Sequence, residues 1–432
     1  MLADDTPDRR DLPKLPATLR SLLSFRRLGP GLITGAADDD PGGIATHSQL
    51  GAQFGLSMLW TVVLTYPLMT AIQSICARIG RVTGEGLAAN MTHVLPRWLA
   101  NVIVLLLLVA NTVNIGADLA AMGAAAQLVL GWGEVFFAIL FAVGSLVLQV
   151  FVPYHRYVHV LKWLTLSLLA YVGVVFTVTI DWMSVFRGTI WPEMEWSRDA
   201  VIVFVAVLGT SISPYMFFWQ SAEEVEDSAL DGKGSLLDHP ANAPTELNRI
   251  AWDNYVGMAF ACVISFFIVL TTAVTLHTAG ITDIATSAEA AQALRPIAGE
   301  FAFLLFSLGI VGTGLLALPV LAGSAAYAIG ELRGWRIGLE EKPENAKAFY
   351  GIIALSFLIG LGMLFLPVDP IKALFWSAVL NGLIAVPLMV ATMIVASSGK
   401  RLGPFVAPPM LKFVGWSATA LMALAALAMF VP

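Results

Sequence analysis

The chain has 432 residues, of which 58% are hydrophobic and only 12% are charged, and its formal net charge at pH 7 is -6. Apolar runs of about 20 residues, the length that crosses a bilayer as a helix, recur from one end of the chain to the other. This composition excludes an ordinary soluble domain and indicates an all-α polytopic membrane protein.

The N-terminal segment, residues 1–27, is polar and mixed in charge, and it lacks the apolar core of a signal peptide. We therefore expect it to be a cytosolic tail. Eleven apolar segments follow, and each predicts a transmembrane helix. They are residues 28–54, 57–77, 100–130, 133–153, 159–181, 200–226, 251–277, 299–330, 348–367, 371–398 and 412–431.

The positive charges predict how the chain is oriented. With a cytosolic N-terminus, all but four of the 24 Lys and Arg residues lie on the inner side, and the exceptions are Arg187, Arg198, Arg295 and Lys372. This bias fits the positive-inside rule. We therefore expect a multi-pass protein of the plasma membrane, with its N-terminus in the cytoplasm and its C-terminus outside.

Two of the eleven segments, the first and the sixth, are interrupted by Pro41 and Pro214. Broken helices at corresponding positions of two five-helix halves are typical of an inverted repeat with a substrate site at mid-membrane. We therefore divide the chain into a first repeat at residues 28–181, a second at residues 182–398, and an eleventh helix within residues 399–432.

Three consecutive aspartates, Asp38, Asp39 and Asp40, stand at the first break, in the stretch AADDDPGG. A charged side chain at the bilayer centre costs roughly 2.5–3.5 kcal/mol. No Lys or Arg lies inside a predicted span, away from its ends, to pair with these aspartates. We therefore predict that a metal cation is their partner, as substrate and not as a resident cofactor.

Four further stretches of sequence accompany these aspartates: GPG at residues 29–31, DPG with IATHSQLGAQFG within residues 40–55, QSICARIGRVTGEGLA at residues 73–88, and ADLA at residues 117–120. In this combination the chain resembles the natural resistance-associated macrophage protein (Nramp) family of divalent-metal transporters. The resemblance implies a LeuT-like fold of eleven helices with a 5+5 inverted repeat.

The family binds its metal through a DPGN motif in the first helix and Ala-x-x-Met-Pro-His in the sixth. The resemblance implies metal ligands at the matching positions here, which are Asp40, Gly43, Thr210 and Ser213, followed by Pro214 and Tyr215. The aspartate is retained, whereas the asparagine, methionine and histidine are replaced. Because a thioether sulfur favours softer metals than oxygen ligands do, its loss predicts a harder ion, Mg2+ or Mn2+. The chain thus most resembles the Nramp-related magnesium-transporter branch.

Adjacent helical positions point about 100 degrees apart, so the three aspartates cannot all face one ion unless the helix is unwound. We expect Asp40 to bind the metal directly. Asp39 is expected to contact the direct ligands or to bind the metal through a water molecule. Asp38 is interpreted as lining a vestibule or packing helices. The carbonyl of Gly43 is expected to serve where the family has an amide side chain.

The proton relay of the family is largely altered in this chain. Asp118 matches a family aspartate, but Ala121 replaces the acid three residues later, and Tyr215 and Gln220 replace histidines. Asp118, with Asn111 and Asn114 close by in sequence, is either a remnant of the relay, a hydrated group near the metal or a patch that joins helices. This pattern predicts uncoupled or weakly proton-coupled transport.

The sixth helix continues into SAEEVED at residues 221–227, which is either a funnel that collects cations or a solvated helix end. The expected function is transport of hard divalent cations by alternating access, without enzymatic activity, a nucleic-acid partner or an obligatory protein partner. Three alternatives stay open: a proton-coupled Mn2+ transporter, an ion-coupled symporter of a small organic solute, and a metal sensor or scaffold that binds ions without transporting them.

Overall fold

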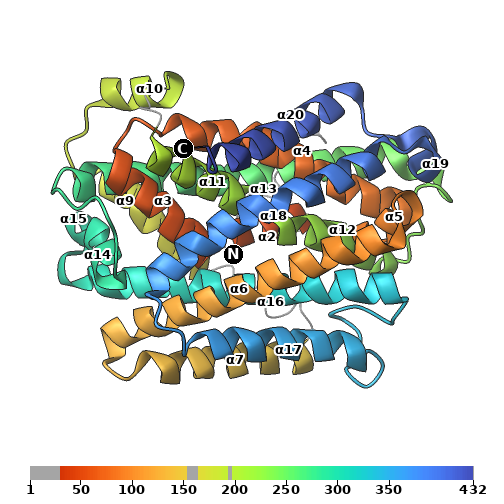
Figure 1. Cartoon of the computed structure of the whole chain (residues 1–432), viewed down its shortest axis with the longest axis horizontal. Coiled ribbons are helices and arrows are strands. Elements are labelled where there is room, and N and C mark those ends of the chain that lie inside the picture. The colour runs from red at the N-terminus through yellow and green to blue at the C-terminus, as the bar shows by residue number, and fades with distance from the viewer. Residues whose placement is uncertain (1–29, 153–163, 193–196, 432) are drawn as a thin grey trace, which may run out of the picture.

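The computed structural model describes residues 30–152, 164–192 and 197–431, and its regular elements there are all helices (Figure 1). The predicted N-terminal tail lies outside the described residues. The long helices run side by side along the longest axis of the molecule, as expected for a bundle that crosses a bilayer.

The first half of the chain contains α2 (Pro30–Asp38), α3 (Pro41–Phe54), α4 (Trp60–Thr83), α5 (Leu87–Val94), α6 (Arg97–Leu130), α7 (Glu134–Phe151), α9 (Leu169–Val175) and α10 (Trp182–Ile190). The second half contains α11 (Arg198–Ser211), α12 (Pro214–Leu230), α13 (Ala243–Thr272), α14 (Ser287–Ala291), α15 (Arg295–Ala298), α16 (Ala302–Arg333), α17 (Lys347–Met363), α18 (Pro370–Ser397), α19 (Gly399–Leu402) and α20 (Pro409–Ala428).

Short turns join several of these helices. They are the 3-10 turns η2 (Leu164–Leu168), η3 (Pro240–Asn242), η5 (Gln292–Leu294), η6 (Gly299–Phe301) and η7 (Gly403–Phe405), and the π-helical turn η4 (Ala273–His277) that extends α13. Sequence reasoning did not anticipate α10 or the short helices α14 and α15, which it left within connecting segments.

Each of the eleven predicted segments contains helix within the described residues, with turns or irregular residues at the two breaks and at several segment ends. Within the described residues, eight helical stretches are long and apolar enough to cross a membrane by themselves. The remaining three segments are the broken first helix, the fifth, described only from Leu164, and α17, which has 17 residues. The count of eleven crossings therefore stays a prediction.

Both predicted interruptions are present. The first helix ends at Asp38 and restarts at Pro41, and the sixth ends at Ser211 and restarts at Pro214. Proline favours the first position of a helix, because its missing N–H would have no partner there and its φ angle is already helical. Each proline therefore starts a new helix after two residues of extended or irregular chain.

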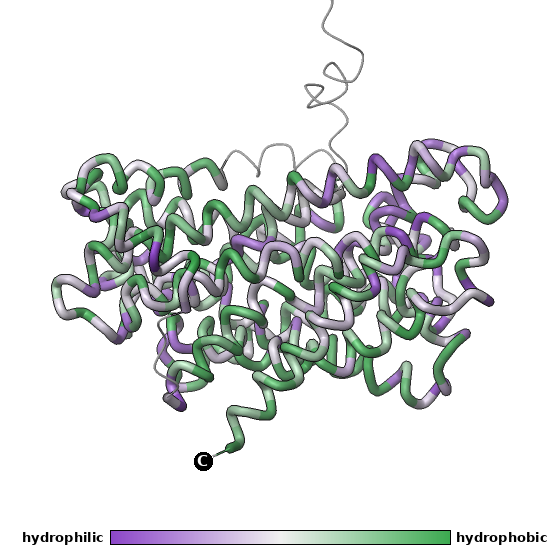
Figure 2. Tube along the Cα trace, turned by 90° about the horizontal axis from the view of Figure 1, so that it is seen from above, coloured by the Kyte–Doolittle hydropathy of each residue, from purple (hydrophilic) through white to green (hydrophobic). Residues whose placement is uncertain are grey.

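The bundle has two parts (Figure 1). Helices α6, α7, α16 and α17 lie side by side along one flank, and the broken helices pack with α4, α13 and α18 in the remainder. Hydrophilic residues are most frequent toward the end of the long axis where α5, α12 and α19 lie (Figure 2). That end carries the residues predicted to face the cytosol.

Outward faces of the bundle are apolar. Leu105 on α6, Phe136 on α7, Leu358 on α17 and Leu424 on α20 are each about half exposed or more. A bilayer would cover such side chains, whereas water would not accommodate so many of them. The exposed apolar flanks therefore support a membrane location.

Candidate metal centre

The two helix breaks meet in the interior of the bundle. Tyr215, the second residue of α12, donates its hydroxyl to the carbonyl of Ala37 and to Oδ2 of Asp40, both at 3.1 Å. Thr210, near the end of α11, approaches Gly43 at the start of α3. The predicted ligand positions of the first and sixth helices are therefore neighbours in space although about 170 residues separate them in sequence.

Asp40 both caps a helix and faces this junction. It is the N-cap of α3, and its Oδ1 accepts the backbone N–H of Gly43 at 2.6 Å. Aspartate is a preferred N-cap because its carboxylate satisfies an N–H that the helix leaves unpaired. The side chain is only 6% exposed and is free of any ion pair among the described residues. Each oxygen accepts one hydrogen bond and retains a lone pair that a cation could use.

Gly43 lies close to Asp38, Asp40 and Thr210. A Cβ at this position would lie 3.0 Å from the carbonyl oxygen of Asp38 and 3.5 Å from Oδ1 of Asp40 and Oγ1 of Thr210. Three oxygens from three residues therefore surround the place where the family carries its amide side chain. The carbonyl of Gly43 itself accepts a hydrogen bond from Nδ1 of His47 at 2.8 Å, so it is already engaged within α3.

Ser213 supplies a hydroxyl at the break of the sixth helix. Its Oγ donates to the carbonyls of Gly209 at 2.8 Å and Thr210 at 2.7 Å, which are among the last carbonyls of α11. Ser213 and Thr210 are both buried. The Ser213 proton is thus turned back to the chain, which leaves the oxygen lone pairs for an acceptor role toward a cation.

Asp39 does not point to Asp40. Its Oδ1 accepts a hydrogen bond from Ser265 of α13 at 3.3 Å. In the described part of the chain, no three His, Cys, Asp or Glu side chains lie close enough together to hold a metal ion as a group. The junction therefore offers one carboxylate with hydroxyl and carbonyl oxygens, and the role of Asp39 as a ligand through water stays a prediction.

Three of the residues predicted to lie near the metal without binding it directly make hydrogen bonds to other helices. They are Asn111, Asn114 and Gln220. Asn111 donates from Nδ2 to the Leu321 carbonyl and to Ser324 Oγ, both at 2.8 Å on α16, so it joins helices. Asn114 joins α6 to α18 by donating to Oδ1 of Asn381 at 3.0 Å, and Gln220 accepts from Thr34 at 2.6 Å.

Asp118 differs from these three residues, because one of its carboxylate oxygens is unpaired in the described part of the chain. It is 1% exposed, its Oδ2 has no hydrogen-bond partner among the described residues, and it lies within electrostatic range of Asp40. A buried carboxyl group with one unpaired oxygen therefore lies near the junction. The three interpretations of Asp118 given above all remain predictions.

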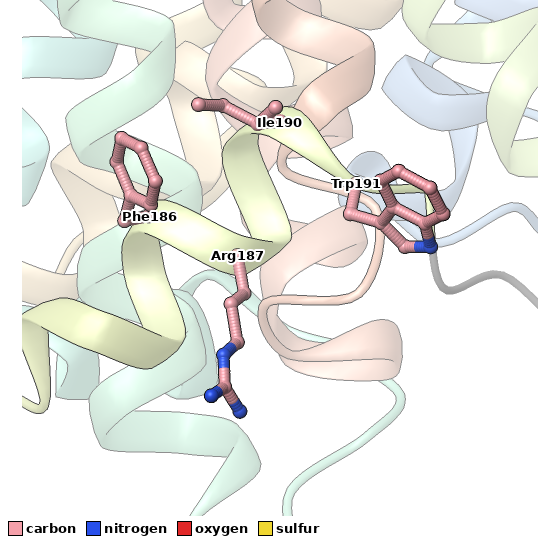
Figure 3. Close-up of a pocket in the computed structure, with 4 residues that line it drawn as sticks. All are labelled: Phe186, Arg187, Ile190 and Trp191. Atoms are coloured by element: carbon pink, nitrogen blue, oxygen red, sulfur yellow. The ribbon is translucent and has the colours of Figure 1, made fainter.

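A hollow of about 210 Å³ lies beside α3 and α18, lined among others by Gln49, Asp283 and Lys372. Because Lys372 belongs to the few cations predicted to face outward, this hollow is on the predicted external side. A larger hollow of about 400 Å³ is lined by Phe186, Arg187, Ile190 and Trp191 around α10 (Figure 3). None of the predicted ligands lines either hollow.

Sequence reasoning missed the partners that hold the junction together. The carbonyl of Ala37, Ser265 on α13 and Asn381 on α18 contact Tyr215, Asp39 and Asn114 respectively. Two of these partners, Ser265 and Asn381, are polar residues within apolar helices, and this pattern could have marked them as candidates for contacts between helices. Their distance in sequence gave no indication of which residue each would contact.

Residues 31–432 match the family described as natural resistance-associated macrophage protein-like, or Nramp. This protein belongs to the Nramp family. It is 25% identical over 404 residues, or 91% of each chain, to a Klebsiella pneumoniae subsp. pneumoniae protein named divalent metal cation transporter MntH. A protein of the same name from Aeromonas hydrophila subsp. hydrophila is 29% identical over 312 residues, which are 68% of this chain and 70% of the relative. These Nramp relatives are named as transporters, which agrees with the expectation that the chain is not an enzyme.

Solved structures show the same fold. The Eremococcus coleocola manganese transporter matches 96% of this Nramp chain and 88% of its own, with a TM-score of 0.76 and 16% identity. Mhp1, a nucleobase-cation-symport-1 family transporter, matches 93% and 91% of the two chains with a TM-score of 0.57 and 13% identity. The predicted all-helical transporter fold is thereby confirmed, whereas the boundaries of the two repeats remain predictions.

Proposed function

We propose that this Nramp protein carries hard divalent cations, Mg2+, Mn2+ or both, across the plasma membrane by alternating access. The observation that supports this most directly is the oxygen-only junction of the broken helices. Asp40, Thr210 and Ser213 bring carboxylate and hydroxyl oxygens together, and the family's methionine position is occupied by Ser213. Oxygen ligands suit Mg2+ and Mn2+, whereas a thioether would favour softer metals.

The lack of a side chain at Gly43 supports a place for magnesium in this substrate range. Mg2+ gives up its water ligands reluctantly and is commonly bound with several of them retained. A site without a side chain at position 43 has more room for retained water than one that carries an amide there. Mn2+ accepts the same oxygen ligands, so we propose that both ions pass.

The membrane potential suffices to drive uptake. Two charges moving down 100 mV release about 4.6 kcal/mol, which corresponds to accumulation on the order of a thousandfold. Because Ala121 and Tyr215 replace groups of the family's proton relay, we propose flux without obligatory proton movement. The external hollow beside α3 and α18 would admit the cation, and the end of α12 would release it.

A proton-coupled Mn2+ transporter is the second candidate. The manganese transporter of the same fold and the retained Asp118 favour it. Proton movement separates the two candidates, since an internal pH dye would report acidification with metal uptake only in the coupled case. The three aspartates at the first break disfavour symport of an organic anion, because they would repel its negative charge.

The test is uptake by purified protein in liposomes under an inside-negative potential, with Mg2+ and Mn2+ supplied separately and detected by an internal metal dye. We expect flux of both ions without acidification. Asp40→Asn should lower both fluxes about a hundredfold or more, because asparagine keeps the N-cap but removes the charge that offsets cation dehydration. Flux of neither ion in the wild type would contradict the proposal.

Asp369→Asn is the matched control for this variant. Asp369 also caps a helix that starts with proline, and its Oδ1 accepts the N–H of Ile371 at 3.0 Å, but it lies at the start of α18 and outside the junction. We expect wild-type flux in Asp369→Asn. An equal loss in both variants would mean that a weakened helix cap, and not a lost metal ligand, explains the effect at Asp40.

A further inference from the structure

The inner halves of the two broken helices contact each other below the junction. These halves are α2, which ends at Asp38, and α12, which starts at Pro214. The hydroxyl of Thr34 on α2 donates to Oε1 of Gln220 on α12 at 2.6 Å, and both residues are fully buried. A cation that moves from Asp40 between these helices toward the predicted cytosolic end would meet this contact.

One turn of α13 is bonded to both inner halves. Oδ2 of Asp253 accepts the backbone N–H of Gly31, at the start of α2, at 2.8 Å. Arg249 donates from Nη2 to Oε2 of Glu224 on α12 at 2.6 Å. Positions 249 and 253 are four residues apart in α13, so their side chains project from the same face of the helix. A single face of α13 therefore contacts α2 and α12 together.

Both contacts are shielded from water. Glu224 is fully buried and Asp253 is 5% exposed, whereas the side chain of Arg249 is 30% exposed. Hydrogen bonds that involve an ionised group are stronger than neutral ones, and removing one partner of a buried pair leaves a charge without compensation. Breaking either contact is therefore more costly than breaking an exposed ion pair.

The same turn of α13 is also attached to α4, a helix that has no break. Glu246, three residues before Arg249, accepts from Nε of Arg249 at 3.1 Å and lies 3.5 Å from Nε of Arg81 on α4. Arg81 is 1% exposed, and its Nη1 donates to the carbonyl of Gly234, in the segment after α12, at 2.8 Å. This turn of α13 thus has a fixed position in the bundle, and an inner half that moves must give up its contact with it.

We propose that Arg249 and Asp253 form an inner clamp, which keeps the cytosolic exit closed by holding α2 and α12 against each other. Alternating access requires that the two sides of the site open in turn. Arg249 and Asp253 act through the two inner halves and are therefore positioning residues. This inference rests on the proposed function, because the exit belongs to the same transport path.

The inner clamp links opening of the exit to release of the cation. Tyr215, near the start of α12, donates its hydroxyl to Oδ2 of Asp40 and to the carbonyl of Ala37. If α12 moves away from α2, it draws this hydroxyl away from both acceptors. The carboxylate that binds the cation would therefore lose a partner at the moment when the exit opens.

The experiment measures how fast a cysteine at position 34 reacts from the cytosolic side. Thr34→Cys is placed in a background of Cys76→Ala and Cys262→Ala, and inside-out membrane vesicles are treated with a membrane-impermeant maleimide. We expect slow labelling while the inner clamp is intact. Arg249→Gln and Asp253→Ala should each raise the labelling rate about tenfold, the size expected for the loss of a hydrogen bond to a charged group.

Arg401→Gln is the matched control, at the same end of the molecule. Arg401 on α19 donates from Nε to Oδ1 of Asn90 at 2.6 Å and pairs with Glu85, so its contacts join α19 to α5 and to the turn before it. Neither α2 nor α12 takes part in these two contacts. We expect the labelling rate of Thr34→Cys to stay unchanged. An equal rise in this control would mean that general loosening, and not release of the inner clamp, exposes position 34.

Folding is checked separately, because Arg249→Gln removes the cation beside a buried carboxylate. Each variant is labelled below its own melting midpoint and must elute as a single monodisperse peak. If Arg249→Gln does not fold, Glu224→Gln tests the same contact, because it keeps an acceptor for Arg249 and removes only the charge. We then expect a rise in labelling of about threefold, since a neutral acceptor forms a weaker hydrogen bond.

The outcomes separate this inference from the proposed function. An unchanged labelling rate in both clamp variants, with metal flux in the wild type, would overturn the inner clamp and leave the transport function standing. A rise in only one variant would mean that the two inner halves are held separately, which also overturns a shared clamp. A rise in both variants without metal flux in the wild type would support the inner clamp and reject the transport function.

Discussion

At the scale of single residues, Ser213 should control the preference between metals. It stands where the family has methionine, and its hydroxyl contacts the carbonyls of Gly209 and Thr210. Ser213→Met replaces an oxygen with a soft sulfur and frees the Thr210 carbonyl. We expect the ratio of Mn2+ to Mg2+ uptake to rise about tenfold, which corresponds to 1.4 kcal/mol. Uptake of the two ions from separate solutions into liposomes measures this ratio.

Ser213→Thr is the control, because it retains the hydroxyl and adds only a methyl group. Its ratio of Mn2+ to Mg2+ uptake should stay near that of the wild type. An unchanged ratio in Ser213→Met would mean that ligand softness does not set selectivity in this protein.

Residue chemistry and residue contacts were not equally predictable. The DPG motif and the second break indicated Asp40 and Thr210, and the structure brings both to one junction. The contact of Asp39 with Ser265 could not be predicted, because it depends on how Gly35 meets Gly257 across two helices that are 222 residues apart in sequence. The engaged carbonyl of Gly43 depends on a side-chain rotamer of His47, which a motif does not specify.

At the scale of elements, Tyr215 joins the two broken helices. Its hydroxyl on α12 contacts Ala37 at the end of α2 and Asp40 at the start of α3. Tyr215→Phe leaves two buried acceptors unpaired, so we expect a loss of about 1–2 kcal/mol in stability. The KM for the metal should also rise, because Asp40 loses a partner that orients it. Thermal unfolding in detergent and liposome uptake measure the two effects.

Tyr350→Phe is the matched variant for this test. Its hydroxyl donates to the carbonyls of Leu339 and Glu341 in the segment after α16. We expect a similar loss of stability with an unchanged KM. If Tyr215→Phe lowered stability without raising KM, the hydroxyl would serve packing alone.

The inner end of α12 should be more sensitive to mutation than its sequence indicates. Glu224 is fully buried and pairs with Arg249 of α13 at 2.6 Å, and Arg249 also contacts Glu246 at 3.1 Å. Arg249→Gln leaves a buried carboxylate without its cation, and such a change costs about 3 kcal/mol. We expect a clearly lower melting midpoint.

Lys372→Gln provides the comparison for Arg249→Gln. Lys372 and Asp283 are 3.6 Å apart, and their side chains are 49% and 71% exposed. An exposed pair of this kind contributes about 1 kcal/mol or less. Equal shifts of the melting midpoint in the two variants would contradict the structural role assigned to Arg249.

Helices could be predicted from sequence where a long apolar run specifies them. The burial of a charged side chain could not be predicted where it depends on a partner from another helix. The predicted segments contain observed helix and both predicted breaks are present, but α10 has only nine residues and carries no long apolar run. The acidic stretch at residues 221–227 was interpreted as a funnel or a solvated end. Glu223 and Glu224 are in fact buried, because Arg249 on another helix offsets one of the charges.

At the scale of the whole molecule, the distribution of charge predicts which end faces the cytosol. In a background of Cys76→Ala and Cys262→Ala, a cysteine at Phe430 should react with a membrane-impermeant maleimide in intact cells. A cysteine at Glu344, in the segment between α16 and α17, should react only after the cells are permeabilised. The reverse pattern would contradict the predicted orientation and exchange the entry and exit sides.

The double role of Asp40 has a consequence for the whole transport cycle. Its two carboxylate oxygens accept hydrogen bonds from the N–H of Gly43 and the hydroxyl of Tyr215. Because both donors belong to the protein, they would keep the direction of the carboxylate and the start of α3 after a cation departs. A carrier that works without a coupling ion must return empty after every delivery. An unloaded site that holds its own shape removes the need to refold the junction during that return.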